Sequence, residues 1–359
     1  MNKQPIHGLC NAELAQRARA MLPRGYGMAR RIHRQVMHEG RFEPESFGLG
    51  PEAAGAWRAA FSFELPELVA VKSDDGEHGA TSKMVLRLKD GLEVESVRIP
   101  MGQGRYTLCV SSQVGCKMGC TFCETGRMGL LRHLRTDEII AQLLVARHRL
   151  GWPIRNLVFM GMGEALDNPE NVLQALRVLN DEAGLAIAQE RLTICTVGHV
   201  HGIRLLDELG FKRLNLSISL NAANDSLRNE LMPVNRRTDL AKLQQALVAY
   251  RPRRNFALGV NYCLLPGIND TEADARAVAA FCRPLDRVLV NLIPYNPGSI
   301  PLTRAPEESE VERFIGWLRA EGLPVRERVT KGRGVMAACG QLGNPAARAK
   351  LKALAAVRV

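Results

Sequence analysis

The sequence predicts an α/β protein whose main part is a parallel sheet covered by helices. From about residue 105 onward, short apolar runs alternate with stretches in which apolar residues recur at helical spacing. This alternation is typical of repeated strand–helix units. The apolar runs are nearly continuous, which is expected when helices cover a parallel sheet. Six such units fit an open or partial (β/α) barrel, and the same pattern also fits a doubly wound sheet.

The first 95 residues have a different pattern and predict a small accessory region. Residues 1–55 carry apolar positions at helical spacing, with Arg and His between them. The segment GLGPEAAGA then interrupts the pattern. Residues 65–100 alternate in polarity and are divided by Asp and Gly turns, which predicts short strands. An Arg-rich helix is commonly just a solvated face, and docking of a polyanion is the functional alternative.

The strands and helices of the main part are expected in strict alternation. Strands are expected at residues 106–112, 156–163, 191–198, 213–220, 257–265 and 287–295. Helices are expected between them at residues 136–151, 169–181, 201–210, 239–251 and 271–283. Thr136 and Thr271 are the expected N-caps of two of these helices, because acidic residues follow each of them within the first turn.

Size and charge limit the classes of function. The 359 residues, of which 46% are hydrophobic, suffice for one large core or for a core with a small appendage. The first twenty residues are polar, and no apolar run approaches the roughly 18 residues of a membrane span. We therefore expect a soluble cytoplasmic protein with no membrane contact. A formal net charge of +11 favours a polyanionic partner, because nucleic-acid affinity comes largely from neutralised phosphates.

Nine cysteines without a secretory signal indicate ligands, reactive thiols or core residues, not a disulfide framework. Cys116, Cys120 and Cys123 form C-x3-C-x2-C in a glycine-rich loop after the first expected strand. A [4Fe–4S] cluster held by three cysteines keeps one iron without a protein ligand. Structural zinc usually has four ligands in paired spacing, and no convincing partner pair is present. We interpret the three cysteines as cluster ligands, with zinc and unrelated core cysteines as weaker alternatives.

This spacing, with Phe122 before the last cysteine, resembles the signature of radical S-adenosylmethionine (SAM) enzymes. The resemblance implies that the amino and carboxylate groups of SAM bind the open iron. One-electron reduction would then cleave SAM to a 5′-deoxyadenosyl radical. The segment GMGEALDN follows the second expected strand, where these enzymes have a GGE-like turn. There Gly163 makes the backbone approachable, and Glu164 is expected to accept the SAM amino group.

Most of the chain, from about Glu95 to Leu342, resembles the rRNA adenine methyltransferases of the RlmN/Cfr type. The matching segments, in agreeing order and spacing, are TLCVSSQVGC, GMGEALDN, LSISLNAANDSLRNELMPVN, NLIPYNP and AACGQL. The resemblance implies a radical SAM partial (β/α)6 barrel at residues 96–345. The accessory region of residues 1–95, with a role in RNA docking, would precede this barrel, and a basic tail of residues 346–359 would follow it.

The same resemblance implies an activity, cofactors and partners. The enzyme would methylate the C2 or C8 carbon of an adenine in 23S rRNA, with tRNA as a further substrate. Its cofactors would be a [4Fe–4S] cluster and SAM, and a flavodoxin or ferredoxin would supply electrons. We expect a monomer, since a barrel with a docking region needs no partner subunit. The residues that match SAM contacts are Gly163, Glu164, Cys195, Ser219, Leu220, Asn221 and Asn296.

Three further residues gain roles only from the resemblance. Cys339 matches a thiol that takes a methyl group from one SAM; a radical from a second SAM then activates that methyl group for addition to adenine. Cys109 matches the thiol that releases the product by forming a disulfide with Cys339. Glu95 matches the carboxylate that removes the ring proton. Considered alone, Cys109 would be a core cysteine and Glu95 a surface residue of a strand.

The chain departs from the family pattern at several positions. Cys195 stands where serine is usual, and Asn221 stands where histidine is usual. Glu124 replaces a small hydroxyl residue after the last cluster cysteine, and alanine replaces proline after Glu164. The segment KGRGVMAACGQL lacks the acidic residues that normally precede the carrier cysteine. We expect the chemistry to be retained, while the identity of the substrate nucleotide stays open.

Two alternatives belong to other functional classes. A radical SAM enzyme with a non-RNA substrate would share the cluster but would need neither the Cys109–Cys339 pair nor the excess of positive charge. An iron–sulfur or zinc protein that only binds RNA would need no SAM pocket. Three remaining cysteines, Cys10, Cys263 and Cys282, are expected to be structural.

Overall fold

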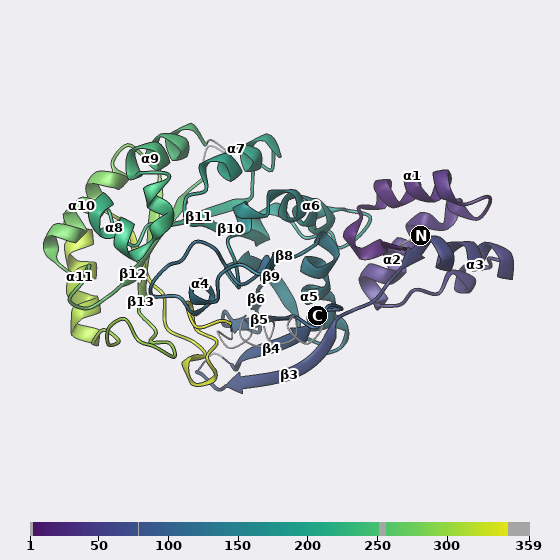
Figure 1. Ribbon diagram of the computed structural model, residues 1–359, viewed down its shortest axis with the longest axis horizontal. Coiled ribbons are helices and arrows are strands. Elements are labelled where there is room, and N and C mark those ends of the chain that lie inside the picture. The colour runs from purple at the N-terminus through teal and green to yellow at the C-terminus, as the bar shows by residue number, and fades with distance from the viewer. Residues whose placement is uncertain (1–2, 78, 251–255, 344–359) are drawn as a thin grey trace, which may run out of the picture.

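A computed structural model describes residues 3–77, 79–250 and 256–343. The expected basic tail of residues 346–359 lies outside the described residues. One ten-stranded sheet forms the centre of the molecule, and a group of N-terminal helices lies beside it (Figure 1). The strand order across this sheet is β14-β13-β12-β11-β10-β9-β6-β5-β4-β3.

Seven neighbouring strands of this sheet are parallel, and they include all six strands expected from the sequence. They are β6 (Tyr106–Cys109), β9 (Ile154–Phe159), β10 (Leu192–Thr196), β11 (Asn215–Ser219), β12 (Leu258–Leu264), β13 (Val288–Pro294) and β14 (Val325–Glu327). The linear strand order from β6 to β14 excludes a doubly wound sheet, in which the order reverses at a switch point. The arrangement is a partial barrel.

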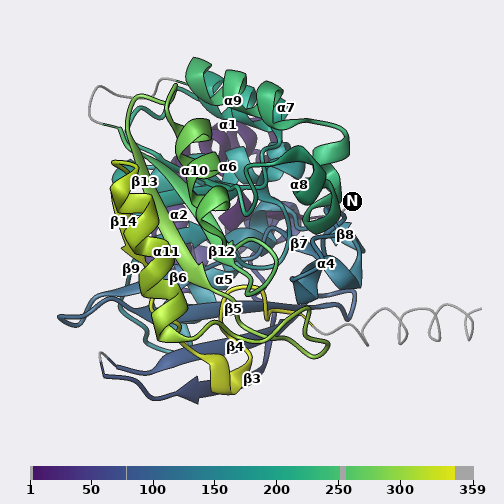
Figure 2. The same ribbon diagram turned by 90° about the vertical axis from the view of Figure 1, so that its left-hand side faces the viewer.

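Helices lie between these strands along the chain, and the longer ones cover the outer side of the sheet (Figures 1 and 2). They are α4 (Glu124–Met128), α5 (Thr136–His148), α6 (Pro169–Asn180), α7 (Val200–Glu208), α8 (Asp225–Leu231), α9 (Leu240–Ala249), α10 (Glu272–Cys282) and α11 (Glu308–Ala320). The N-cap prediction for Thr271 is confirmed, since its hydroxyl accepts the Asp274 N–H at 3.2 Å. The N-cap prediction for Thr136 is wrong by one residue. Thr136 is already helical, and its hydroxyl lies 3.3 Å from the Asn171 carbonyl, to which it donates.

Three antiparallel strands extend the sheet beyond β6. They are β3 (Glu67–Asp74), β4 (Thr81–Arg87) and β5 (Glu93–Pro100). Met84, Leu86 and Val94 on one face are fully buried in the same core as α5. The strand-like part of the expected accessory region is therefore joined to the main sheet. The boundary expected at residue 95 falls inside β5 and stays a prediction.

The N-terminal helices have a core of their own. They are α1 (Asn11–Met21), α2 (Ala29–Glu39) and α3 (Pro51–Ala60), and their side chains pack around the fully buried Trp57. The Trp57 indole donates to the Gly25 carbonyl at 3.2 Å, so its polar atom is satisfied. This group contacts α5 and α6 through the turn at Ile6–Gly8 (Figure 1).

The remaining elements are short. Two two-stranded sheets are formed by β1 (Gln4–Pro5) with β2 (Phe61–Ser62), and by β7 (Gln113–Val114) with β8 (Arg132–His133). Single 3₁₀ turns lie at Ile6–Gly8, Tyr26–Met28, Pro44–Phe47, Ala165–Asp167, Gln189–Arg191, Pro233–Arg236 and Arg333–Val335. None of the described helices is both long enough and apolar enough to span a bilayer.

Candidate active site

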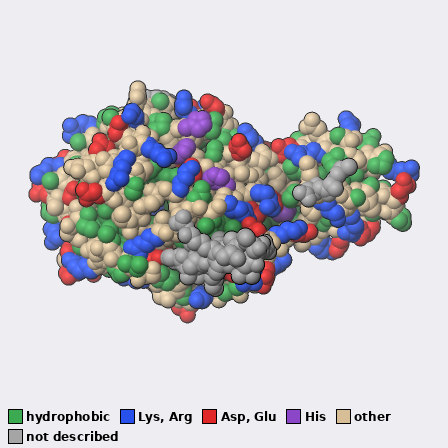
Figure 3. Space-filling view, in the orientation of Figure 1, with side chains coloured by type: hydrophobic (Ala, Val, Ile, Leu, Met, Phe, Trp, Pro, Cys, Tyr) green, Lys and Arg blue, Asp and Glu red, His purple; other side chains and the backbone are tan. Residues whose placement is uncertain are grey.

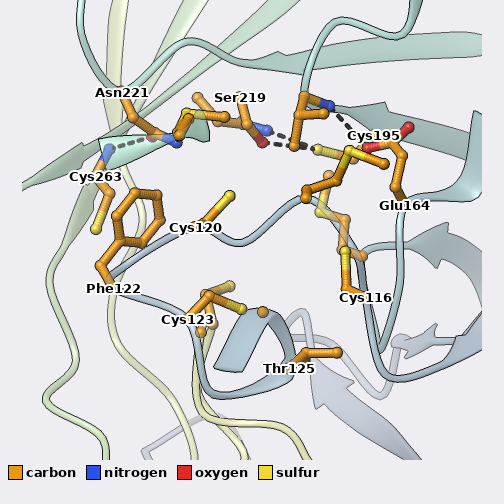
Figure 4. Close-up of a pocket in the computed structure, with 18 of the residues that line it drawn as sticks. Cys116, Cys120, Phe122, Cys123, Thr125, Glu164, Cys195, Ser219, Asn221 and Cys263 are labelled. Atoms are coloured by element: carbon orange, nitrogen blue, oxygen red, sulfur yellow. Dashed lines mark hydrogen bonds between the residues drawn. The ribbon is translucent and has the colours of Figure 1, made fainter. Parts of the chain in front are cut away.

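A cavity of about 1000 Å³, counting its open mouth, lies at the carboxyl ends of the parallel strands. This is the end of a (β/α) barrel where functional side chains collect. The segments that end or follow β9, β10, β11, β12 and β13 contribute to its lining, and the loop of residues 116–126 forms a facing wall. Figure 4 shows Cys116, Cys120 and Cys123 on one side, with Glu164, Cys195, Ser219 and Asn221 across from them.

The loop that carries the three cysteines is held by backbone contacts. The Cys116 N–H donates to the Gly129 carbonyl at 3.1 Å, and the Thr121 N–H donates to the Leu231 carbonyl at 3.0 Å. Gly115 has a φ of +77°, and a Cβ at this position would clash with the Gly129 carbonyl. Only glycine fits this approach of two backbones. The glycine-rich sequence therefore forms a tight loop that presents its thiols to the cavity.

The chemistry of these thiols fits a bound metal cluster. Burial raises the pKa of Cys116 to about 12 and the pKa of Cys120 well above its ordinary value. Without metal these groups are therefore protonated at neutral pH, and a cation is needed to stabilise them as thiolates. No three His, Cys, Asp or Glu side chains within the described ranges are grouped to hold a single ion. Three thiols that line one cavity could hold a [4Fe–4S] cluster and leave one iron without a protein ligand.

Glu164 faces the cysteine loop from the turn after β9. Its carboxylate accepts the Val197 N–H at 2.9 Å and the Leu166 N–H at 3.1 Å. Burial nevertheless raises the pKa of this carboxyl to about 7. Gly163 precedes it with a φ of +103°, and a Cβ there would come within 2.6 Å of the Gln113 side chain. The G-x-G-E turn thus aims a buried carboxyl into the cavity, where it can accept a hydrogen bond from an amino group.

Cys195 lies next to Glu164 at the end of β10 and joins a row of polar groups across the strand ends. Its Sγ lies 3.5 Å from the Ser219 hydroxyl and accepts the Asn261 amide at 3.2 Å. The Asn291 amide donates in turn to Asn261 at 3.0 Å. Burial raises the pKa of Cys195 to about 11, so the thiol is neutral and can replace a serine hydroxyl as a weak donor and acceptor.

The other expected SAM contacts are placed differently. Asn221 lines the cavity with a φ of +57°, and its side-chain oxygen accepts the Cys263 N–H at 2.9 Å. Leu220 is fully buried, so only its backbone is available to a ligand. Asn296 lies beneath the segment of Cys339: its amide points to the Cys339 carbonyl at 3.5 Å, and its oxygen accepts from Arg333 at 3.1 Å.

The structure brings Cys339, Cys109 and Glu95 to the same end of the sheet. Cys339 is exposed and lines the cavity, whereas Cys109 is buried at the end of β6. Burial and then the nearby Cys339 raise the pKa of Cys109 above its ordinary value. Glu95 accepts the Gly343 N–H at 2.9 Å, which anchors the segment that carries Cys339. All described cysteines are free thiols, so the Cys109–Cys339 disulfide stays a prediction.

Glu124, which departs from the family pattern, forms hydrogen bonds that join three segments of the chain. Its N–H donates to the Gly340 carbonyl at 2.8 Å, next to Cys339. Its carboxylate accepts the Ser299 N–H at 2.7 Å and the Ser299 hydroxyl at 2.8 Å. A Cβ at Gly298 would overlap this carboxylate. Glu124 therefore fixes the loop after β13 against the cysteine loop and the Cys339 segment.

Two residues of the site were missed or misassigned from the sequence. Cys263, expected to be structural, lines the cavity together with Asn261 two residues earlier on β12. Residues two apart on a strand share a face, so the position of Asn261 could have indicated the placement of Cys263. Lys83, which forms an ion pair with Glu95 at 3.2 Å, had no signal in the sequence.

Comparison with known proteins agrees with this geometry. Residues 110–279 match the Radical SAM superfamily. A probable dual-specificity RNA methyltransferase RlmN 1 of Protochlamydia amoebophila is 47% identical over 267 residues, which cover 74% of each chain. A dual-specificity RNA methyltransferase RlmN of Syntrophotalea carbinolica is 42% identical over 286 residues, covering 79% of this chain and 74% of the relative.

The chain belongs to the RlmN family of radical SAM methyltransferases. The crystal structure of a radical SAM methyltransferase from Sphaerobacter thermophilus has a TM-score of 0.84 and 34% identity, covering 94% of this chain and 99% of that one. An RlmN-family enzyme uses a [4Fe–4S] cluster and SAM. In this chain Cys116, Cys120 and Cys123 would hold the cluster, and Glu164 lines the same cavity.

Proposed function

We propose that the protein methylates a ring carbon, C2 or C8, of an adenine in 23S rRNA, with tRNA as a further substrate. The observation that carries the proposal is the placement of Cys339. Its exposed thiol lies at a cavity walled by three cluster cysteines, and it is close enough to the buried Cys109 to contribute to the raised pKa of that thiol. This pairing of two thiols gives no advantage to a radical enzyme that acts on other substrates.

In this proposal each residue has one task. Cluster and SAM, when bound, supply a methyl group and one-electron chemistry. Glu164 orients the amino group of SAM, and Cys339 accepts the methyl group on Sγ and carries it to the adenine carbon. Glu95 takes the proton from that carbon. The Cys109 thiolate then attacks Cys339 Sγ, so that an S–S bond forms as the S–C bond to the product breaks. The electron pair of the S–C bond stays on the product carbon, which takes up a proton to become a methyl group, and the one electron released would return to the cluster.

The RNA substrate is supported by the names of the relatives and by the charge of the chain. Both bacterial relatives are named dual-specificity RNA methyltransferases. The net charge of +11 suits a polyanion. We further propose that residues 1–95 help to dock the RNA, that a flavodoxin or ferredoxin supplies electrons, and that the protein works as a cytoplasmic monomer.

Methyl transfer to defined RNAs tests the proposal. The protein is reconstituted with iron and sulfide without oxygen and incubated with methyl-labelled SAM, a reductant and either 23S rRNA fragments or tRNA. Nuclease digestion and mass spectrometry then identify the labelled base. We expect label on C2 or C8 of adenine, and none with Cys339→Ser or Cys109→Ser. Cys282→Ala, which changes a buried cysteine on α10, is the matched control and should keep activity.

Other outcomes would contradict the proposal. Cleavage of SAM with no label in either RNA would favour a radical SAM enzyme with a non-RNA substrate. RNA binding without cleavage of SAM would favour a protein that only binds RNA.

A further inference from the structure

Lys83 and Glu95 form a nearly buried ion pair on two neighbouring strands. Lys83 lies on β4 opposite Val97 of β5, and Glu95 lies on β5 opposite Val85. The two charged residues are thus diagonal neighbours on one face of the hairpin. Lys83 Nζ lies 3.2 Å from Glu95 Oε1, and the two side chains are only 9% and 14% exposed.

Each residue of the ion pair forms a hydrogen bond with the segment that carries Cys339, one before and one after that cysteine. Lys83 Nζ donates to the Met336 carbonyl at 3.0 Å, three residues before Cys339. Glu95 Oε2 accepts the Gly343 N–H at 2.9 Å, four residues after it. Both residues of the pair therefore hold the methyl-carrying segment as well as each other.

A contribution to the stability of the fold does not by itself explain a nearly buried ion pair at this position. Taking two charges out of water costs about as much as their attraction returns, and apolar residues often replace buried ion pairs without loss. Lys83 also has no role among the expected cluster or SAM contacts. The feature that distinguishes it is its contact with Glu95, the carboxylate that the proposed function assigns to proton removal.

We propose that Lys83 is a positioning residue for the proton-transfer step. It fixes the direction of the Glu95 carboxylate and balances its charge, so that the base and the Cys339 segment are held as one unit. In this step a C–H bond of the adenine carbon breaks and an O–H bond forms on Glu95. The electron pair of the C–H bond stays in the ring. The inference rests on the proposed function.

The proposal separates two stages of the reaction. Methylation of Cys339 needs neither proton removal nor RNA, so Lys83 can affect it only through the hydrogen bond to the Met336 carbonyl. It should therefore depend on Lys83 much less than product formation does. Proton removal follows the bond between adenine and the Cys339 methylene group. A slow proton step should therefore leave RNA covalently attached to the protein, because Cys109 releases the product only afterwards.

The test uses Lys83→Met in the full-length reconstituted protein. Mass spectrometry measures methyl on Cys339 without RNA, and denaturing gels measure the covalent RNA adduct. We expect Cys339 methylation to change little, with an RNA product rate lower by about 10²-fold and accumulated adduct. Lys83→Arg should restore most of the product rate. Lys89→Met, which removes an exposed ion pair with Glu64 from the same hairpin, is the matched control and should change neither stage.

A double variant tests whether Lys83 acts through Glu95. Lys83→Met added to Glu95→Gln should lower the product rate much less than Lys83→Met does in the unmodified chain, because the interaction between the two side chains is already lost in Glu95→Gln. If the two substitutions lower the product rate independently, so that their fold-changes multiply in the double variant, the proposal is overturned. An unchanged product rate in Lys83→Met would overturn it too, as would a loss of Cys339 methylation equal to the loss of product. Absence of methyl on Cys339 in the unmodified chain would instead mark failure of the proposed function.

Discussion

Burial controls the protonation of the reactive groups in the cavity. Glu164 is 3% exposed, and burial outweighs two backbone hydrogen bonds to raise its pKa to about 7. Burial also raises the pKa of Cys195 to about 11. In the absence of ligands, burial thus favours the neutral, protonated form of these groups. The charge of a bound metal or substrate would be needed to stabilise the thiolate form of the cysteines.

Glu164 should make the metal-free protein less stable as pH rises. A carboxyl whose pKa is raised on folding favours the folded state below its unfolded pKa of 4.5, and this contribution is lost as pH rises through about 7. The loss is at most about 3 kcal/mol. Urea unfolding at several pH values measures it. Glu164→Gln should flatten the fall in the free energy of unfolding between pH 4.5 and 7, and an unchanged slope would contradict the assignment.

The three cluster cysteines should be separable from the other thiols of the cavity. Single substitutions Cys116→Ala, Cys120→Ala and Cys123→Ala should each abolish most iron binding, because each thiolate is a ligand. Cys263→Ala, at a cavity-lining cysteine on another wall, is the control and should keep its iron. The measurement is the iron and sulfide content of each variant after reconstitution. Equal iron loss in Cys263→Ala would make that residue a ligand as well.

Single residues were predictable only where their spacing carries chemistry. The spacing of Cys116, Cys120 and Cys123 is local, and the structure places all three at one wall. Cys109 and Cys339 are 230 positions apart, so only family resemblance could pair them. Lys83 escaped prediction because its partner Glu95 is set by strand register, and a lysine in an alternating strand normally faces water.

The loop after β13 depends on one buried carboxylate. Glu124 is 2% exposed and accepts two hydrogen bonds from Ser299, while Arg127 Nη1 lies 3.2 Å from it. Glu124→Ala should destabilise the fold by about 2–3 kcal/mol, because buried donors and Arg127 lose their partner. Chemical denaturation measures this change. Glu64→Ala, which breaks an exposed ion pair with Lys89, is the control and should cost under about 1 kcal/mol.

Elements were predictable where their hydrophobic pattern is unambiguous. The six apolar runs became strands because both faces of a parallel strand are covered. Strand β14 has only three residues and lies at the sheet edge, so it left no pattern. Strands β3 to β5 were assigned to an accessory region because their alternation indicates one exposed face. That alternation carries no information on which sheet they join.

The whole molecule presents positive charge to its surroundings. Lys and Arg side chains are spread over the face in Figure 3, which includes the N-terminal helical group. Arg30 and Arg34 of α2 are exposed, while Ile32 and Val36 of the same helix are buried in the N-terminal core. The helix therefore has an apolar side that packs and a basic side that is free to meet phosphates.

Charge reversal on α2 should weaken RNA binding without affecting the chemistry at Cys339. Arg30→Glu with Arg34→Glu should lower RNA affinity and reduce the salt dependence of binding by about one unit of slope per lost phosphate contact. Arg276→Glu with Arg319→Glu, at exposed positions on α10 and α11, is the matched control. Binding titrations at several salt concentrations measure the slopes. Equal effects of the two pairs would show nonspecific attraction instead of docking on α2.

A pulse–chase on Cys339 tests most directly whether this residue carries the methyl group to RNA. Reconstituted protein is labelled with methyl-labelled SAM, freed of excess SAM, and then given RNA, reductant and unlabelled SAM. We expect label to leave the Cys339 peptide and to be recovered on an adenine carbon in the first turnover. Labelled adenine without prior label on Cys339, or label that stays on Cys339 while RNA is methylated, would contradict it.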